Sequence, residues 1–329
     1  MSEAKTLGEL KKGGVSVLPV REEMRKNLVR HLESGQRILP GIVGYDETVI
    51  PEIENAILAG HHMVFLGERG QGKSRIIRGL LSLLDERIPI VHGCEINDNP
   101  FSPICRACRN KAAELGDALP LQWIDRDHRY GEKLATPDVS IADLVGEIDP
   151  IKVAEGRYLA DEETIHYGLV PRTNRGIFAI NELPDLTEKV QVGLFNLMEE
   201  KDVQIKGYKI RLPLDVVIVA SANPEDYTSR GRIITPLKDR FDVQIRTHYP
   251  KKIEDELDIM KTAGFWARNT APLTSSPALI FFLAAGGIAK FSANTIMPKP
   301  ATAISSGSIT TESDASGFYK APWNNQCAI

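Results

Sequence analysis

The stretch that decides the fold is Met63-Val-Phe-Leu-Gly67-Glu68-Arg69-Gly70-Gln71-Gly72-Lys73-Ser74. Its apolar start predicts a strand, and the following Arg75–Leu84 predicts an amphipathic helix. The pattern G-x-x-x-x-G-K-S thus stands in its required order of strand, loop and helix. Glycines let successive backbone N–H groups converge on phosphate oxygens, and the start of the helix adds partial positive charge. We therefore predict a nucleoside-triphosphate site over Gly67–Ser74, with Lys73 on the β- and γ-phosphates and Ser74 on magnesium.

Length and charge narrow the class of protein. A chain of 329 residues with 42% hydrophobic content predicts one large domain or two modest ones. A net charge of −4 gives no overall attraction to nucleic acid or to an anionic membrane, so neither is an expected partner. The N-terminus lacks the pattern of a signal peptide, and the longest apolar run, Ala278–Ala289, is shorter than a membrane span of roughly 20 residues. A cytoplasmic protein is expected.

Two further apolar strands are predicted to end in polar groups that suit phosphate chemistry. The strand from Gly176 ends at Asn181 and Glu182, where magnesium and the attacking water must be held, and Glu182 is the candidate general base. The strand Val216–Ala222 precedes Asn223, which would orient the water or simply make a turn before proline. Arg240 would complete a phosphate site, or is a surface arginine. A helix cap or surface acid is the alternative for Glu182.

Three of the four cysteines lie close together in the sequence, which fits a reduced compartment better than a disulfide framework. Cys105 and Cys108 have the spacing of a zinc knuckle, and Cys94 is a third candidate ligand. His92 or His128 would be the fourth. Loop cysteines without a metal are the alternative, because the chain has a single such pair.

The remaining pattern predicts the organisation of the chain. We expect an N-terminal helical segment over residues 1–40, a nucleotide-binding domain over 41–255 and a tail over 256–329. Within the domain, strands are predicted at Ile88–Val91 and at residues 157–160, and a β-hairpin is predicted at residues 202–213.

These residues resemble the AAA+ ATPases of the magnesium-chelatase ATPase-subunit type, in the clade that also holds MoxR-like ATPases. The resemblance runs from about Gly41 to Tyr249 and includes the phosphate loop, the inserted segment 146–175 and the hairpin before Val216. It implies a P-loop α/β fold, an αβα sandwich with a parallel sheet and β-hairpin insertions. It also implies a hexameric ring that binds ATP and Mg²⁺, with a von-Willebrand-type, integrin-like partner subunit. Asn223 would be the sensor-one residue and Arg240 the arginine finger, while the insertion and hairpin would face the ring pore or partner.

Two departures from the family pattern bear on activity. Asn181 stands where the family usually has aspartate, so magnesium would lose one nearby negative group, and we expect slower turnover rather than none. The family continues into a charged helical lid, whereas residues 263–329 carry only six charged side chains and are rich in Ser, Thr, Ala, Pro and Gly. The lid is thus expected to be missing or aberrant, either as a disordered tail or, as we favour, a frameshifted reading.

The expected function is an ATP-driven AAA+ motor that remodels a partner, which in the chelatase serves Mg²⁺ insertion into protoporphyrin. A MoxR-like chaperone is the alternative within this class. A DNA-remodelling AAA+ protein and a nucleotide-gated module that does not hydrolyse ATP are alternatives from other classes.

Overall fold

The computed structural model describes residues 3–154, 164–200, 202–205, 208–223 and 231–262. Its central element is a five-stranded sheet in the order β11-β1-β10-β7-β4, in which all neighbouring strands are parallel. The strands are β1 (Met63–Leu66), β4 (Tyr130–Leu134), β7 (Gly176–Asn181), β10 (Val216–Ala222) and β11 (Val243–Arg246). A parallel sheet covered on both faces requires nearly continuous apolar strands, which is how the sequences of β1, β7 and β10 read.

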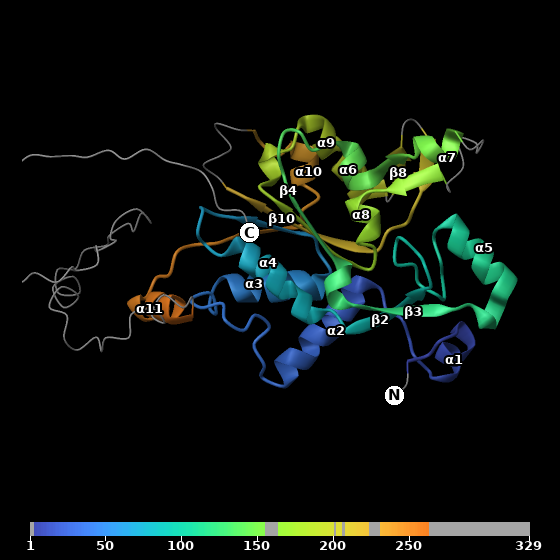
Figure 1. Ribbon diagram of the computed structural model, residues 1–329. Coiled ribbons are helices and arrows are strands. Elements are labelled where there is room, and N and C mark those ends of the chain that lie inside the picture. The colour runs from blue at the N-terminus through green and yellow to red at the C-terminus, as the bar shows by residue number, and fades with distance from the viewer. Residues whose placement is uncertain (1–2, 155–163, 201, 206–207, 224–230, 263–329) are drawn as a thin grey trace, which may run out of the picture. The chain divides into compact units, whose positions relative to one another are not determined.

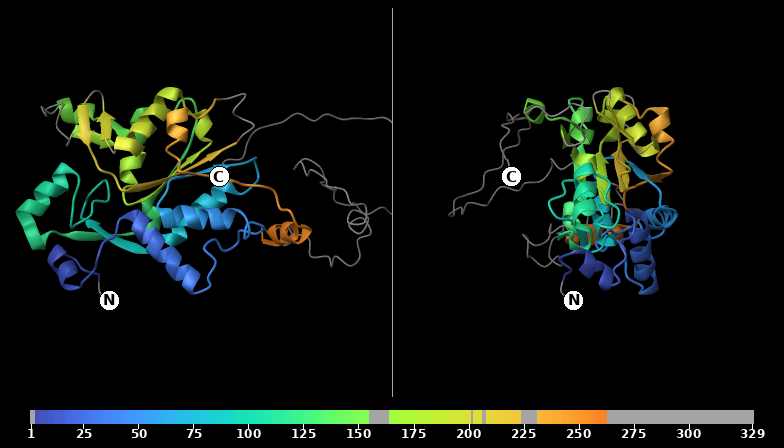
Figure 2. Two further views of the ribbon diagram at one scale, coloured as in Figure 1. Left: turned by 180° about the vertical axis from the view of Figure 1, so that it is seen from behind. Right: turned by 90° about the vertical axis from the view of Figure 1, so that its right-hand side faces the viewer.

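Helices cover both faces of this sheet (Figures 1 and 2). Alternate side chains of each strand point to opposite faces, so Met63 and Phe65 join one hydrophobic cluster and Val64 joins the other. The first face is covered by α2 (Val20–Glu33), α3 (Val49–Ala59), α4 (Lys73–Gly79) and the 3-10 helix η1 (Leu80–Leu83). The second face is covered by α6 (Ile141–Val145), α8 (Leu169–Arg172), α9 (Glu188–Glu200) and α10 (Thr235–Lys238). The predicted αβα sandwich is confirmed.

Among the described residues, three antiparallel strand pairs lie outside the main sheet. They are β2 (Arg87–Val91) with β3 (Leu121–Asp125), β5 (Gly146–Ile148) with β6 (Ile165–Tyr167), and β8 (Asp202–Ile205) with β9 (Tyr208–Arg211). The predicted hairpin therefore forms as β8 and β9. The strand predicted at Ile88–Val91 also forms, but it pairs with β3, and the edge position of the main sheet belongs to β4, which the sequence did not suggest.

Further helices complete the described chain. They are α1 (Leu7–Lys12), α5 (Arg106–Leu115), α7 (Pro150–Ala154), α11 (Ile253–Thr262) and the 3-10 helices η2 (Gly116–Ala118), η3 (Arg126–Arg129) and η5 (Leu183–Asp185). The strand predicted at residues 157–160 and the predicted tail beyond residue 262 lie outside the described residues, and the predicted domain boundaries remain predictions. Within the part of the chain that is described, no helix combines the length and hydrophobicity that a membrane crossing needs.

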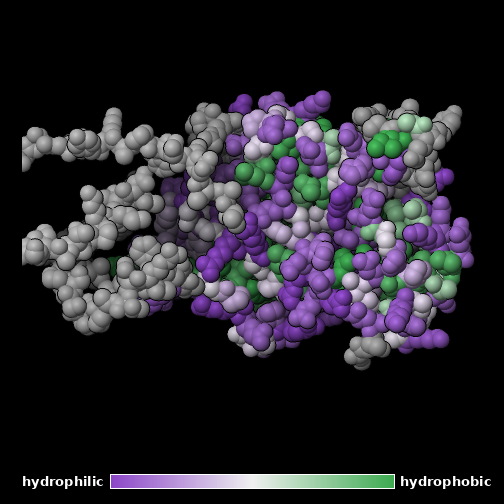
Figure 3. All heavy atoms as spheres, viewed as in Figure 1, coloured by the Kyte–Doolittle hydropathy of each residue, from purple (hydrophilic) through white to green (hydrophobic). Residues whose placement is uncertain are grey.

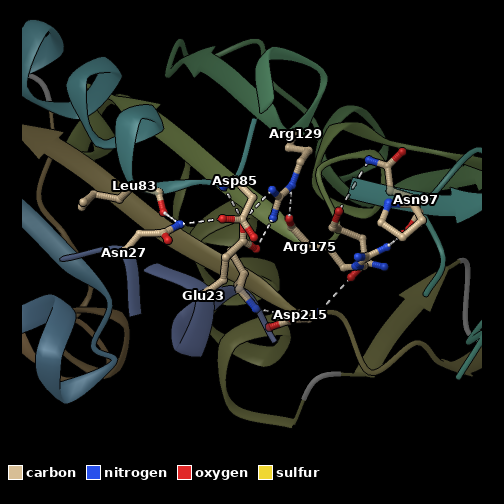
Figure 4. Close-up of polar contacts among 11 residues, drawn as sticks. Glu23, Asn27, Leu83, Asp85, Asn97, Arg129, Arg175 and Asp215 are labelled. Carbon is tan, nitrogen blue, oxygen red and sulfur yellow. Dashed lines mark hydrogen bonds and ion pairs between the residues drawn. The ribbon is translucent and has the colours of Figure 1, made fainter. Parts of the chain in front are cut away.

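A buried ion pair joins α2 to the segments that lead into the sheet (Figure 4). Two guanidinium nitrogens of Arg129 donate to the two carboxylate oxygens of Glu23 at 2.8 and 2.6 Å, and its Nε donates to the Arg175 carbonyl at 2.8 Å. The Asp85 backbone N–H donates to the same carboxylate at 2.6 Å. The two paired side chains are 0% and 5% exposed, so each charge depends on the other in a site that water does not reach.

Candidate nucleotide-binding site

The phosphate loop lies at the edge where the parallel strands end. Leu66, the last residue of β1, pairs with Ala222 at the end of β10, and Asn181 closes β7 at the same edge beside Leu134. The loop therefore starts from a rigid support.

Glycine is required in this loop for two different reasons. A Cβ added at Gly67 would lie 2.0 Å from the Thr247 Oγ1 and 2.2 Å from the Gln71 Oε1, so a side chain there would displace both groups and break their hydrogen bond. Gly70 and Gly72 instead have φ values of 82° and 75°, which side chains with a Cβ rarely adopt. The loop thus keeps its backbone close and turned, as the sequence pattern predicted.

Lys73 begins α4 and is 7% exposed. Its Nζ donates to the carbonyls of Gly67 at 2.5 Å and Glu68 at 2.8 Å, so the ammonium lies inside the curve of the loop. Ser74, the next residue, is exposed at the start of the helix. A single positive charge enclosed by the loop and a hydroxyl beside it are the groups that a phosphate with a divalent cation needs.

Residues from two distant segments brace the loop. The Tyr45 hydroxyl lies 2.8 Å from the Gln71 carbonyl and 2.6 Å from the His248 carbonyl, and burial raises the pKa of this tyrosine. Thr247 donates to the Gln71 side chain at 2.6 Å, and the Tyr249 hydroxyl donates to the Arg69 carbonyl at 2.8 Å. The chain after β11 therefore holds the loop in shape, which the sequence did not reveal.

Asn181 lies beside a carboxylate that the sequence did not single out. Its Nδ2 donates to the Glu132 Oε1 at 2.6 Å, and its Oδ1 accepts from Ser221 at 3.3 Å. Arg78 donates two bonds to Glu132, at 2.8 and 2.9 Å, and Tyr130 donates a third at 3.0 Å. The hydrogen bonds from Arg78 are the main cause of the lowered pKa of Glu132, so this carboxylate is ionised at neutral pH. A negative charge is thus present one strand away from the position where the family usually has aspartate.

Glu182 and Asn223 follow neighbouring strands at the same edge. Glu182 has a φ of 56°, and its backbone N–H donates to the Ser221 hydroxyl at 3.2 Å. Because β10 lies between β1 and β7, Asn223 stands between the phosphate loop and Glu182 in strand order, and it is 2% exposed. The predicted residues of this edge are therefore brought together, although their catalytic roles remain predictions.

Arg240 lies against α9. Its Nε contacts the Glu199 carboxylate at 2.7 Å, and its guanidinium lies 5.5 Å from the centre of the Phe195 ring. Its side chain is 43% exposed. In a single copy of the chain Arg240 thus pairs with α9, and its proposed action on a neighbouring subunit stays a prediction.

The three cysteines meet as expected, but with a different fourth group. Cys94, Cys105 and Cys108 cluster with Asp98, and among the described residues neither His92 nor His128 belongs to this group. Histidine as the fourth member is therefore wrong. Hydrogen bonds from the Cys105 and Cys108 thiols lower the pKa of Cys94, while burial raises the pKa of Asp98 to about 6.

The chain is similar in sequence to subunits of magnesium chelatase. The chain is 30% identical over 236 residues to the magnesium-chelatase subunit ChlI of Nostoc sp. (strain PCC 7120), covering 69% of this chain and 59% of that protein. It is 26% identical over 232 residues to the magnesium-chelatase 38 kDa subunit of Cereibacter sphaeroides, covering 67% and 61%. It is also 26% identical over 234 residues to a ChlI homolog of Methanocaldococcus jannaschii, covering 69% and 59%. The chain spans about three-fifths of the length of these relatives.

Two further comparisons address the fold. A model of the complex between subunits BchI and BchD of magnesium chelatase, based on a cryo-EM reconstruction, matches with a TM-score of 0.50 and 25% identity over 69% of this chain and 68% of that one. The family model of the Sigma-54 interaction domain matches residues 153–243. With the phosphate loop, the parallel sheet and these similarities together, the chain is a ChlI-like protein of the AAA+ class, similar to the magnesium-chelatase subunits of that type.

Proposed function

We propose that this chain binds ATP with Mg²⁺, hydrolyses it, and uses the cycle to remodel a partner protein. The observation that carries the proposal is the shared carboxyl edge of β1, β10 and β7, which gathers Lys73, Asn223 and Glu182. These residue types supply a cation for the phosphates, an amide to orient water and a base to accept its proton. Arg69, Gly70 and Gln71 lie within the same loop and complete the proposed nucleotide contacts.

The magnesium that accompanies ATP would be held through Ser74, with Asn181 nearby. Magnesium prefers oxygen ligands and usually retains several waters, so one hydroxyl and neighbouring polar groups fit it. Bound there, the ion would neutralise charge that develops on the phosphates. The ionised Glu132 accepts a hydrogen bond from Asn181 at 2.6 Å, and its negative charge would attract the cation across the Asn181 side chain.

The assembly belongs to the same proposal. We propose a homohexameric ring in the cytoplasm in which Arg240 leaves Glu199 and acts on the nucleotide of the neighbouring subunit, with an integrin-like or von-Willebrand-type subunit as partner. Support comes from the similar structure, which is a complex of two magnesium-chelatase subunits, and from the exposure of Arg240. Figure 3 shows one face of the molecule, which is largely hydrophilic with hydrophobic residues interspersed among the hydrophilic ones. Participation in Mg²⁺ insertion into protoporphyrin is proposed from the relatives' names alone.

A second candidate function is action on a transcription complex. The match of residues 153–243 to the Sigma-54 interaction domain favours it, although this range does not contain the phosphate loop. Direct binding of purified sigma-54 in the presence of ATP would distinguish it from a chelatase-type role.

The test uses Glu182→Gln, with the exposed Glu188→Gln on α9 as the matched control. Glutamine keeps the size and the hydrogen bonding of Glu182 but cannot accept the proton. We expect ATP affinity to stay near that of the unmodified chain, and phosphate release to fall by roughly 10²- to 10⁴-fold. Hydrolysis at the unmodified rate would refute Glu182 as the base. ATP binding without any hydrolysis by the unmodified chain would instead support a nucleotide-gated module.

A further inference from the structure

The cysteine cluster is built from two segments that pack together. Cys94 follows β2, Asp98 lies four residues later, and Cys105 and Cys108 stand at the beginning of α5. The three sulfur atoms and one Asp98 oxygen all lie within 4.8 Å of one another. Cys105, Cys108 and Asp98 are 6%, 2% and 0% exposed and Cys94 is half-buried, so most of the cluster is shielded from solvent.

The thiols are arranged as metal ligands rather than as a disulfide. All three are free, and three sulfurs in one cluster leave at least one unpaired in any disulfide arrangement. The backbone N–H of Asp98 donates to the Cys94 sulfur at 3.4 Å, and that of Cys108 donates to the Cys105 sulfur at 3.4 Å. Backbone N–H groups are thus directed at two of the three sulfurs, and the thiolate is the form of cysteine that binds a metal.

Asp98 gives a second and independent indication of a ligand. Its Oδ2 accepts the backbone N–H groups of Ile104 at 3.2 Å and Cys105 at 3.0 Å, which fix the direction of the carboxylate. Its Oδ1 is buried and has no hydrogen-bond partner among the described residues. A buried carboxylate oxygen left without a partner is costly, and such atoms are rare in folded proteins. A cation at the centre of the cluster would satisfy it.

We propose that Cys94, Asp98, Cys105 and Cys108 bind one structural zinc ion. Three thiolates with one carboxylate offer the soft, four-ligand set that tetrahedral zinc takes, with no position left for a substrate. Zinc–sulfur bonds of about 2.3 Å would place the sulfurs about 3.8 Å apart, so the cluster needs only a small contraction. The ion also offsets the mutual repulsion of four negative groups. The closed ligand set makes the site structural rather than catalytic.

The position of the site says what the ion would stabilise. The Asn97 side chain, inside the metal loop, donates to the Arg172 carbonyl at 2.9 Å. Asn174 donates to the Ile96 carbonyl at 2.9 Å, and Arg175 donates to the Pro89 carbonyl at 2.8 Å. The loop is thus bonded to the residues that lead into β7, at the end of that strand away from Glu182. The zinc would fasten the start of α5 to the core at the amino end of this strand.

The test is metal analysis of the full chain purified without chelator. We expect about one zinc per chain, and loss of most of it in Cys108→Ser. The fourth cysteine, Cys327, provides the matched control, and Cys327→Ser should keep the full zinc content. Asp98→Asn should weaken zinc binding at least about tenfold in competition with a chromophoric chelator, since even groups behind the ligands contribute that much.

Cobalt substitution of the unmodified chain keeps the proposal testable where a cysteine variant fails to fold. Cobalt in this site should give a thiolate charge-transfer band in the near ultraviolet and the intense visible bands of a tetrahedral ion. Less than a tenth of an equivalent of zinc, with no uptake of added zinc or cobalt, would overturn the proposal. So would iron with acid-labile sulfide in place of zinc, or equal zinc loss in Cys327→Ser.

Discussion

Asn181→Asp places a second carboxylate where an amide now donates to Glu132 at 2.6 Å. The change removes a hydrogen bond to a charged group, which contributes about 1.5–3 kcal/mol. It also adds repulsion of about 4 kcal/mol for two charges roughly 4 Å apart at an effective dielectric constant near 20. Arg78 and solvent screen part of this repulsion, because Glu132 is 22% exposed. Without magnesium, we expect the free energy of unfolding to fall by about 3 kcal/mol at pH 7.

The sign of the pH dependence follows from the same contact. Repulsion by Glu132 raises the pKa of the introduced aspartate above its ordinary value of about 3.9. The cost is therefore full at pH 7 and shrinks as the pH falls and the aspartate is protonated. Urea unfolding followed by tryptophan fluorescence, at pH 7 and near pH 4.5, measures both. The double variant Asn181→Asp with Glu132→Gln exchanges the carboxylate and the amide, and it should recover at least half of the loss.

The consequence for activity reverses the expectation from the family pattern. If asparagine were merely a weakened aspartate, restoring the acid would raise turnover or magnesium affinity. Because Glu132 already supplies the charge, we expect both to fall in Asn181→Asp. Unchanged stability at pH 7, a double variant no better than the single one, or a rise in turnover would refute this reasoning.

The remaining predictions concern ionisable side chains that are buried, with one exposed ion pair as a control. Glu23→Gln leaves the Arg129 charge without its partner in a site that is 0% exposed, so the free energy of unfolding should fall by about 3 kcal/mol or more in urea titrations. Asp117→Asn breaks the exposed pair with Lys11, and as the control it should cost under about 1 kcal/mol. The pKa of His62 is lowered to about 4, mainly by burial and next by the positive charge of Arg21, while the negative charge of Asp242 raises it in part. The stability gained from neutral His62 is complete above pH 6.5 and is lost as the pH falls toward 4, by up to about 3 kcal/mol, so His62→Gln should flatten the stability curve there.

The parts of the fold that the sequence predicted are those set by local pattern. The phosphate loop combines a strand, glycines and a helix within a short stretch. β7 and β10 are continuous apolar runs, as expected for strands of a sheet that is covered on both faces. The sequence does not predict β4, because Tyr130-Gly-Glu-Lys-Leu134 carries polar residues, as an edge strand can. The strand at Ile88–Val91 was found but not its partner, since pairing depends on contacts distant in sequence.

The parts of the site that the sequence missed depend on tertiary contacts. Glu132 can be recognised as part of the site only once β4 is paired with β7, because this pairing brings Glu132 within hydrogen-bond distance of Asn181. Asp98 completes the cysteine cluster although His92 is nearer to Cys94 in sequence, because the fold of the loop, and not sequence distance, decides which side chain faces the sulfurs. The contact of Thr247 with Gln71 likewise depends on the pairing of β11 with β1, which the sequence does not predict.

The most direct test of the nucleotide site is equilibrium binding of ATP with magnesium to the unmodified chain, to Lys73→Ala and to the exposed control Lys189→Ala. Lys73 is the cation inside the loop, and a hydrogen bond between charged groups contributes about 1.5–3 kcal/mol. Lys73→Ala should therefore weaken ATP binding roughly ten- to a hundredfold, while Lys189→Ala binds as the unmodified chain does. ATP affinity unchanged by Lys73→Ala, in a variant that folds normally, would contradict the assignment of Gly67–Ser74 as the nucleotide site.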